Sequence, residues 1–152
     1  MPAVSTVPDL STLEVLMDAW TQPFWDATAQ KRLVVPRCAA CSRFRWPPGP
    51  FCPRCQSQLT EWVEPGLARI YTFTIIQEQP ERQVEGPQYR VPALIEFPAA
   101  DGIRMLAAIV GTPLTEIRIG VEVALGWSKA GDVMVPVFSV PGDFGHGLAT
   151  GA

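Results

Sequence analysis

The sequence is short of histidine, of long apolar runs and of positive charge. Its single histidine, His146, lies in a glycine-rich tail, where we expect a solvated side chain with no catalytic role. No apolar run reaches the roughly 18 residues of a membrane-spanning helix, so we expect no membrane partner. Twelve Lys and Arg stand against 15 Asp and Glu, giving a formal net charge of −3. This balance makes nucleic acid an unlikely partner.

Common enzyme motifs are also missing. The sequence has no Gly-x-x-x-x-Gly-Lys phosphate loop, no dinucleotide-binding glycine pattern and no Gly-x-Ser-x-Gly nucleophile elbow. Residues 1–10 carry neither the basic start nor the apolar stretch of a secretory signal, so we expect a cytoplasmic protein. We name no catalytic residue and expect a chain that is not an enzyme by itself.

The composition that remains favours a mainly β protein. The chain has 152 residues, of which 47% are apolar, enough for one ordinary domain or two very small ones. Sixteen prolines and 12 glycines indicate many turns and few long helices.

The four cysteines form two Cys-x-x-Cys pairs separated by ten residues: Cys38, Cys41, Cys52 and Cys55. Two such pairs can place four thiolates around one ion, and we predict a structural zinc site because four cysteines close the coordination shell. Iron in a rubredoxin-like site is the main alternative. Two disulfides would require an oxidising compartment, and a thioredoxin-like motif would explain only one of the pairs.

Residues 31–65 are predicted to form the metal-binding ribbon, with strands at 33–36 and 59–64 in a three-stranded arrangement. Phe44, Trp46 and Phe51 could shield the metal from water. Four arginines crowd the ribbon, either to offset the negative charge of a four-thiolate zinc site or to bind an anion: Arg37, Arg43, Arg45 and Arg54.

Residues 1–30 are predicted to be a flexible N-terminus followed by a helical arm. Leu13, Leu16, Met17 and Trp20 recur at helical spacing after a possible Ser11 or Thr12 cap. Pro23 should end or kink that helix, and a second short helix should follow. Trp20, Phe24 and Trp25 are candidates for docking a partner subunit, although core packing is the simpler interpretation.

Residues 66–141 are predicted to form a barrel of five strands, near 68–76, 92–97, 103–110, 121–127 and 133–140. A helical turn should lie between the third and fourth strands, which matches an OB fold; an SH3-type barrel is the alternative. Residues 77–88 should be a loop long enough to be functional, and residues 142–152 a flexible tail. OB folds bind ligands across a strand face and its flanking loops, so Tyr71, Phe73 and Tyr89 are candidate ligand contacts.

Together these features resemble a family of zinc-ribbon/OB-fold proteins, long catalogued as a domain of unknown function and associated with thiolase-like, acyl-CoA hydratase and lipid-transfer-protein-type aldolase enzymes. The resemblance covers about residues 13–141. It rests on Pro23-Phe24-Trp25, Arg32-Leu33-Val34, Cys38-Ala39-Ala40-Cys41, Trp46-Pro47-Pro48, Cys52-Pro53-Arg54-Cys55 and Ile119-Gly120-Val121-Glu122-Val123. The family often has glycine where this chain has Lys31, Ser42 and Gln56, which bears on the shape of the knuckles.

The resemblance implies a non-catalytic accessory subunit. Such a subunit would bind a thiolase-like, aldolase or hydratase partner and assist binding or channelling of a CoA thioester, in a setting such as steroid or lipid side-chain metabolism. Two alternatives remain open: a nucleic-acid-binding zinc-ribbon/OB module and a stand-alone enzyme acting on acyl-CoA.

Overall fold

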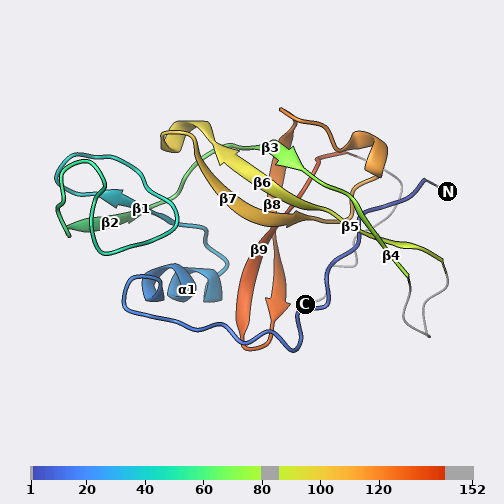
Figure 1. Cartoon of the computed structure of the whole chain (residues 1–152), viewed down its shortest axis with the longest axis horizontal. Coiled ribbons are helices and arrows are strands. Elements are labelled where there is room, and N and C mark those ends of the chain that lie inside the picture. Colours follow the sequence, from blue (N-terminus) through green and yellow to red (C-terminus); the bar gives the residue numbers. More distant parts are fainter. Residues whose placement is uncertain (1, 80–85, 143–152) are drawn as a thin grey trace.

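A computed structural model describes residues 2–79 and 86–142 of the chain. A small metal-binding ribbon lies at one end of the molecule, a closed β-barrel fills the middle, and the N-terminus lies at the opposite end (Figure 1). A single α-helix lies beside the ribbon and the barrel in the described part. It is neither long nor apolar enough to cross a membrane.

The α-helix, α1, spans Gln22–Ala29. The prediction of an earlier helix from residue 11 is wrong for this structure, since residues 11–20 form turns and irregular chain. The Asp18 carboxylate accepts hydrogen bonds from the amides of Trp20 and Thr21 at 2.9 and 2.8 Å and holds a turn just before α1. Pro23 lies in the first turn of α1, where its missing N–H costs nothing. It therefore helps to begin a helix, whereas we expected it to end one.

The ribbon contains two paired strands, β1 (Val35–Cys38) and β2 (Thr60–Val63), which run antiparallel with Cys38 opposite Thr60. Of the predicted three-stranded arrangement, the strands at 33–36 and 59–64 correspond to β1 and β2, and the remaining strand is reduced to one bridge between Arg37 and Phe44. The proline-rich stretch after Trp46 removes the backbone donors that a longer ladder would need.

Five strands close the barrel in the order β3-β6-β7-β9-β8, as predicted in number. Their bounds are β3 Ala68–Phe73, β6 Pro92–Phe97, β7 Ile103–Ile109, β8 Glu122–Ala130 and β9 Val133–Ser139. All neighbours are antiparallel except β7 and β9. A short 3₁₀ helix, η1 (Pro98–Ala100), precedes β7, and the helical turn expected before β8 is η2, Leu114–Glu116.

The long loop between β3 and β6 is partly regular. Short strands β4 (Ile76–Glu78) and β5 (Gln88–Arg90) pair antiparallel, so the prediction of a loop over the whole of 77–88 is wrong at both ends. Residues 80–85 lie outside the described part, as do 143–152, which include His146 and nearly all of the predicted tail.

The first residues are anchored to the barrel. The Ser5 amide donates to the carbonyl of Thr112 at 2.9 Å, and the Gly111 amide donates to the carbonyl of Ser5 at 2.9 Å. The Ser5 side chain is only 2% exposed. The expectation of a flexible start is therefore wrong for these residues, because backbone pairing holds them in place.

One apolar core runs through the barrel and into the ribbon. Phe97 and Phe138 fill the barrel with ring centroids 6.3 Å apart, and Val35 and Leu33 extend the core toward the cysteines. Phe24 of α1, 5% exposed, joins the same cluster. The ribbon, which is too small to form its own core, therefore packs against that of the barrel.

Candidate functional site

The four predicted metal ligands come together at the tip of the ribbon. Their sulfur atoms all lie within 4.8 Å of one another. The Cys38 and Cys55 sulfurs are 3.6 Å apart, as are those of Cys41 and Cys52. Each short distance joins one knuckle to the other, so the two Cys-x-x-Cys pairs face a common centre.

This arrangement fits a tetrahedral metal ion. Zinc holds each thiolate about 2.3 Å away, which places tetrahedral sulfurs about 3.8 Å apart. All four cysteines are free thiols, so no disulfide joins any of them. Four sulfur ligands would fill the coordination shell of such an ion and leave no position for substrate, as in structural zinc sites.

The two knuckles share a local shape that explains how they hold sulfur. The Ser42 amide donates to the Cys38 carbonyl at 2.8 Å and the Gln56 amide to the Cys52 carbonyl at 3.0 Å. Ser42 and Gln56 have φ of +63° and +62°, and Lys31 has +55°. These are the three positions where the resemblance led us to expect glycine, and the chain adopts the left-handed turn there without the residue that adopts it most easily.

Backbone amides also tune the thiols. The amide of Cys55 is the main cause that lowers the pKa of Cys52 to about 6, with the Arg54 amide adding to it. The Cys41 amide likewise lowers the pKa of Cys38. At Cys55 the Ser57 amide acts the same way, but the neighbouring Cys38 thiol and burial outweigh it and raise the pKa to about 11. The first cysteine of each knuckle, Cys38 and Cys52, is thus prepared to bind as a thiolate.

The ribbon arginines have different roles. Arg37 pairs with Glu61 at 3.0 Å across β1 and β2 and lies over the Phe44 ring. Arg45 is buried, and its Nη2 donates to the Gly49 carbonyl and to the Thr60 hydroxyl, while its Nε and Nη1 have no protein partner. Arg43 and Arg54 are exposed. The four therefore do not form one anion-binding patch.

The ribbon aromatics mostly face the protein core. Trp46 lies edge-on to Phe24 with ring centroids 5.2 Å apart, and Phe44 packs against the core cluster. Phe51 is 51% exposed. Phe44 and Trp46 therefore pack toward the protein core, whereas we expected them to shield the metal. Trp46 joins the ribbon to α1.

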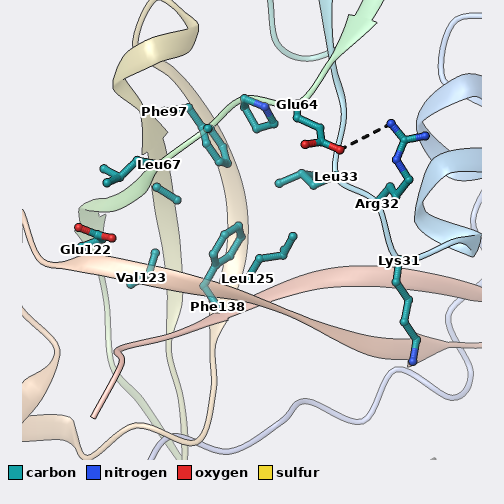
Figure 2. Close-up of a pocket in the computed structure, with 13 residues that line it drawn as sticks. Lys31, Arg32, Leu33, Glu64, Leu67, Phe97, Glu122, Val123, Leu125 and Phe138 are labelled. Atoms are coloured by element: carbon teal, nitrogen blue, oxygen red, sulfur yellow. Dashed lines mark ion pairs between the residues drawn. The ribbon is translucent and has the colours of Figure 1, made fainter.

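A cleft of about 520 Å³ opens where the ribbon meets the barrel. Figure 2 shows Phe97, Phe138, Leu33 and Leu125 gathered around its apolar centre, with Glu122 on one side. On the other side Arg32 and Glu64 form an ion pair at 3.6 Å. The Lys31 ammonium points away from the aromatic pair (Figure 2). The cleft can hold an apolar group of a ligand or of a partner.

The candidate ligand contact Tyr71 lies on a β-bulge in β3, where the pairing with β6 slips between Ile70 and Thr72. A bulge redirects its side chain, and Tyr71 is 41% exposed. The Arg104 guanidinium lies 3.5 Å from its ring centroid, so one face of the ring is already covered by a cation.

Arg104 belongs to a charged network that sequence reasoning missed. Glu96, 9% exposed, accepts from Arg69 at 2.7 Å and faces Arg104 at 3.6 Å. The three residues lie opposite one another on β3, β6 and β7. The register of the strands brings these three residues together, and their positions in the sequence alone do not indicate it. Two arginines sharing one carboxylate leave net positive charge beside Tyr71.

The remaining candidates are dispersed. Phe73 is half-buried against the barrel core, and Tyr89 is half-buried on β5, where its carbonyl accepts from the Thr6 amide at 2.8 Å. Of the proposed docking residues, Phe24 is buried and Trp25 packs on the core, whereas Trp20 is 46% exposed. The core-packing interpretation therefore describes Phe24, which is not available to a partner in this structure.

Family comparisons divide the chain at the point where the ribbon ends. Residues 25–61 match the rubredoxin-like zinc ribbon domain of ChsH2, and residues 62–128 match the ChsH2 C-terminal OB-fold domain. The chain is 39% identical over 118 residues to a probable enoyl-CoA hydratase alpha subunit of Thermomonospora curvata. This match covers 76% of the chain but spans only 36% of the length of that relative.

Two solved structures share the fold. A chain of an Ltp2-ChsH2(DUF35) aldolase superposes with a TM-score of 0.70 and 33% identity, covering 84% of this chain and 98% of that one. A DUF35 protein of unknown function from Sulfolobus solfataricus reaches a TM-score of 0.58 at 18% identity, covering 82% and 87% of the two chains. With four clustered cysteines ahead of a five-stranded barrel, the chain belongs to the ChsH2/DUF35 family of zinc-ribbon and OB-fold proteins.

Proposed function

We propose that this chain is a non-catalytic accessory subunit that binds a thiolase-like or lipid-transfer-protein-type aldolase and helps it to bind or channel a CoA thioester. The observation that carries the proposal is the match to almost the whole of one chain of a solved Ltp2-ChsH2(DUF35) aldolase. The resemblance to a probable enoyl-CoA hydratase subunit supports the same substrate class.

The chemistry of the described residues supports a role without turnover. The four thiols, the strongest nucleophiles in the chain, face one another in a closed shell. No histidine occurs within 2–79 or 86–142 to act as a general base. The metal, which we propose to be zinc, would then hold the ribbon in shape. Four free thiols also suit the reducing cytoplasm, where we place the protein.

The barrel offers a contact for the CoA moiety. CoA carries phosphates, and Arg69 and Arg104 share the single carboxylate of Glu96. Tyr71, stacked on Arg104, lies beside this positive charge. We therefore keep Tyr71 as the leading ligand contact in the proposal, with the less exposed Phe73 and Tyr89 as secondary candidates.

The test is co-expression with the aldolase-type subunit of the same organism, followed by size-exclusion chromatography and an assay of retro-aldol cleavage of a CoA thioester. We expect a stable complex that cleaves the thioester, and no turnover by this chain alone. Turnover by the purified chain, or the lack of any complex, contradicts the proposal. Replacing Tyr71 with alanine should raise KM for the thioester while kcat stays near its original value.

A further inference from the structure

An apolar segment that precedes α1 lies beside the β8–β9 turn near Gly131 but leaves its large apolar side chains exposed. Four large apolar side chains lie within residues 11–20, and their exposed fractions range from 41% to 88%: Leu13, Leu16, Met17 and Trp20. Such a concentration of exposed apolar surface is unusual in a chain that acts alone. The segment runs past the tip of the β8–β9 hairpin before it reaches α1 (Figure 1).

The same residues carry a helical pattern that the free chain does not use. At 3.6 residues per turn, the four apolar side chains would fall within an arc of about 100°. Ser11 and Glu14 have the spacing of a capping box at the start of such a helix. The structure instead has turns here, held by the Asp18 carboxylate through the amides of Trp20 and Thr21.

The reason is that a short helix with an uncovered apolar face is marginal in water. In the free chain, a turn whose amides are bonded by the Asp18 side chain is therefore as stable as such a helix or more so. Covering the apolar face would reverse this balance, because burying each large side chain is worth more than the few hydrogen bonds exchanged. The two conformations differ mainly in whether something covers Leu16 and Trp20.

The charge of the N-terminal residues indicates what kind of surface covers the apolar face of residues 11–20. Residues 1–30 contain Asp9, Glu14, Asp18 and Asp26 and no Lys, Arg or His. In the helical form Glu14 would lie beside the apolar stripe, next to Met17, and Asp18 would lie on the far face. The matching surface is an apolar groove with Lys or Arg along its rim.

We propose that residues 11–20 fold into an amphipathic helix that docks in an apolar, basic-rimmed groove of the partner protein. This inference rests on the proposed function for the identity of that partner, the aldolase-type subunit. It assigns the docking role to Leu13, Leu16, Met17 and Trp20 in place of the buried Phe24.

The experiment uses the full chain and the aldolase-type subunit of the same organism. Amide hydrogen exchange is measured on the free chain and on the complex, and affinity is measured by calorimetry. We expect the amides of residues 13–20 to become protected in the complex. Leu16→Glu and Trp20→Glu should each weaken binding about ten- to hundredfold, and Glu14→Lys should weaken it more at low salt than at high salt.

Two controls make the test specific. Ile119, 69% exposed on another part of the surface, provides a matched apolar-to-acidic change, and Ile119→Glu should alter affinity less than twofold. Val15 would lie opposite the apolar stripe, so Val15→Gly should bind about fourfold more weakly than Val15→Ala only if the bound segment is helical.

The outcomes separate the two proposals. A complex that forms normally with Leu16→Glu, without new protection at residues 13–20, overturns the docking helix and leaves the accessory role standing. Self-association of the chain that depends on Leu16 and competes with the aldolase subunit also overturns it, because the occupant is then a second copy. If no complex forms with the original chain, both the accessory role and the docking helix fail.

Discussion

The carboxylate of Asp101 accepts a hydrogen bond from the backbone N–H of Phe44 at 2.9 Å. This bond joins the metal ribbon to the turn between η1 and β7, across 57 residues of sequence. Asp101 itself has φ of +56°, a conformation that aspartate tolerates better than most residues. The side chain thus serves both the turn and the attachment of the ribbon.

Asp101→Ala should destabilise the chain by about 1–2 kcal/mol, because it removes the bond to Phe44 and leaves alanine in a left-handed conformation. Asp101→Asn keeps an oxygen acceptor and the tolerance for positive φ, so it should cost less than about 1 kcal/mol. Urea unfolding of both variants provides the comparison. Equal losses in the two would mean that the bond to Phe44 contributes nothing.

The metal-binding knuckles should gain stability from glycine. Ser42→Gly and Gln56→Gly relieve positive φ, and after the added chain entropy of glycine each should stabilise the metal-loaded protein by about 0.5–1 kcal/mol. Ala40→Gly is the matched control, since Ala40 lies in the first knuckle without positive φ, and it should destabilise. Thermal unfolding with metal present tests this, and a loss of stability in both knuckle variants would contradict the strain argument.

Removing the metal should affect the ribbon first. The ribbon has little core of its own, whereas the barrel is closed by hydrogen-bonded strands. After chelation we expect rapid amide exchange in β1 and β2 and continued protection in β6 and β7. Elemental analysis should find one metal ion per chain before chelation. A metal-free protein whose ribbon amides stay protected would show that the cysteines need no ion.

Metal affinity should fall as the pH falls. Metal binds the thiolate, and without metal the pKa of Cys55 is raised to about 11, so binding displaces its proton at any pH near neutrality. Each pH unit of acidification then weakens binding about tenfold for this thiol alone, or about a hundredfold from pH 8 to pH 6. Cys52, with a pKa of about 6, is ionised over most of this range. Competition with a chromophoric chelator at the two pH values measures the slope, and a flat profile would be incompatible with it.

Glu96 should be the most sensitive carboxylate of the barrel. Glu96→Gln leaves Arg69 and Arg104 facing each other across a half-buried site without their shared anion, and we expect a loss of about 1–3 kcal/mol. Glu78→Gln breaks a more exposed pair with Arg90 and should cost less than about 1 kcal/mol. Chemical denaturation of the two variants distinguishes them. If Glu78→Gln is the more harmful change, the network is not the stabilising element.

Phe24 and Trp20 should behave in opposite ways. Phe24→Ala opens a cavity between α1 and Trp46 and should destabilise the chain by about 3–5 kcal/mol. Trp20→Ala should change stability by less than about 0.5 kcal/mol, because its side chain is half-exposed. Differential scanning calorimetry measures both. A stable Phe24→Ala variant would restore this residue as a docking candidate.

The sequence correctly predicted the features that depend on interactions between residues close in the chain. Two Cys-x-x-Cys pairs identify a metal site from spacing alone, and β-branched runs between glycine and proline turns locate the five barrel strands. The helical turn before β8 was predicted in the same way. Each of these features depends on residues that are close in sequence.

The errors arise where tertiary contacts outweigh a local pattern. Residues 11–20 have helical spacing, but within the described part of the chain their four large apolar side chains stay 41% to 88% exposed, and Asp18 bonds the amides that would continue the helix. Ser5 looks like part of a loose end, yet it pairs with Thr112 across more than a hundred residues. The network around Glu96 also depends on the barrel register, which the spacing of charges along the chain does not specify.

The anchoring of Ser5 to the barrel has a mechanical consequence. The ribbon is attached to the barrel by the linker at residues 64–67 on one side, and by residues 6–30 on the other, whose far end is held by the Ser5–Thr112 pairing. Tension applied ahead of Ala3 would therefore be carried by the hydrogen bonds at the end of the barrel remote from the cysteines (Figure 1). The metal centre therefore lies in a segment of chain that is held to the barrel at both ends. A force that pulls on the N-terminus would reach this segment only after the hydrogen bonds of Ser5 have broken.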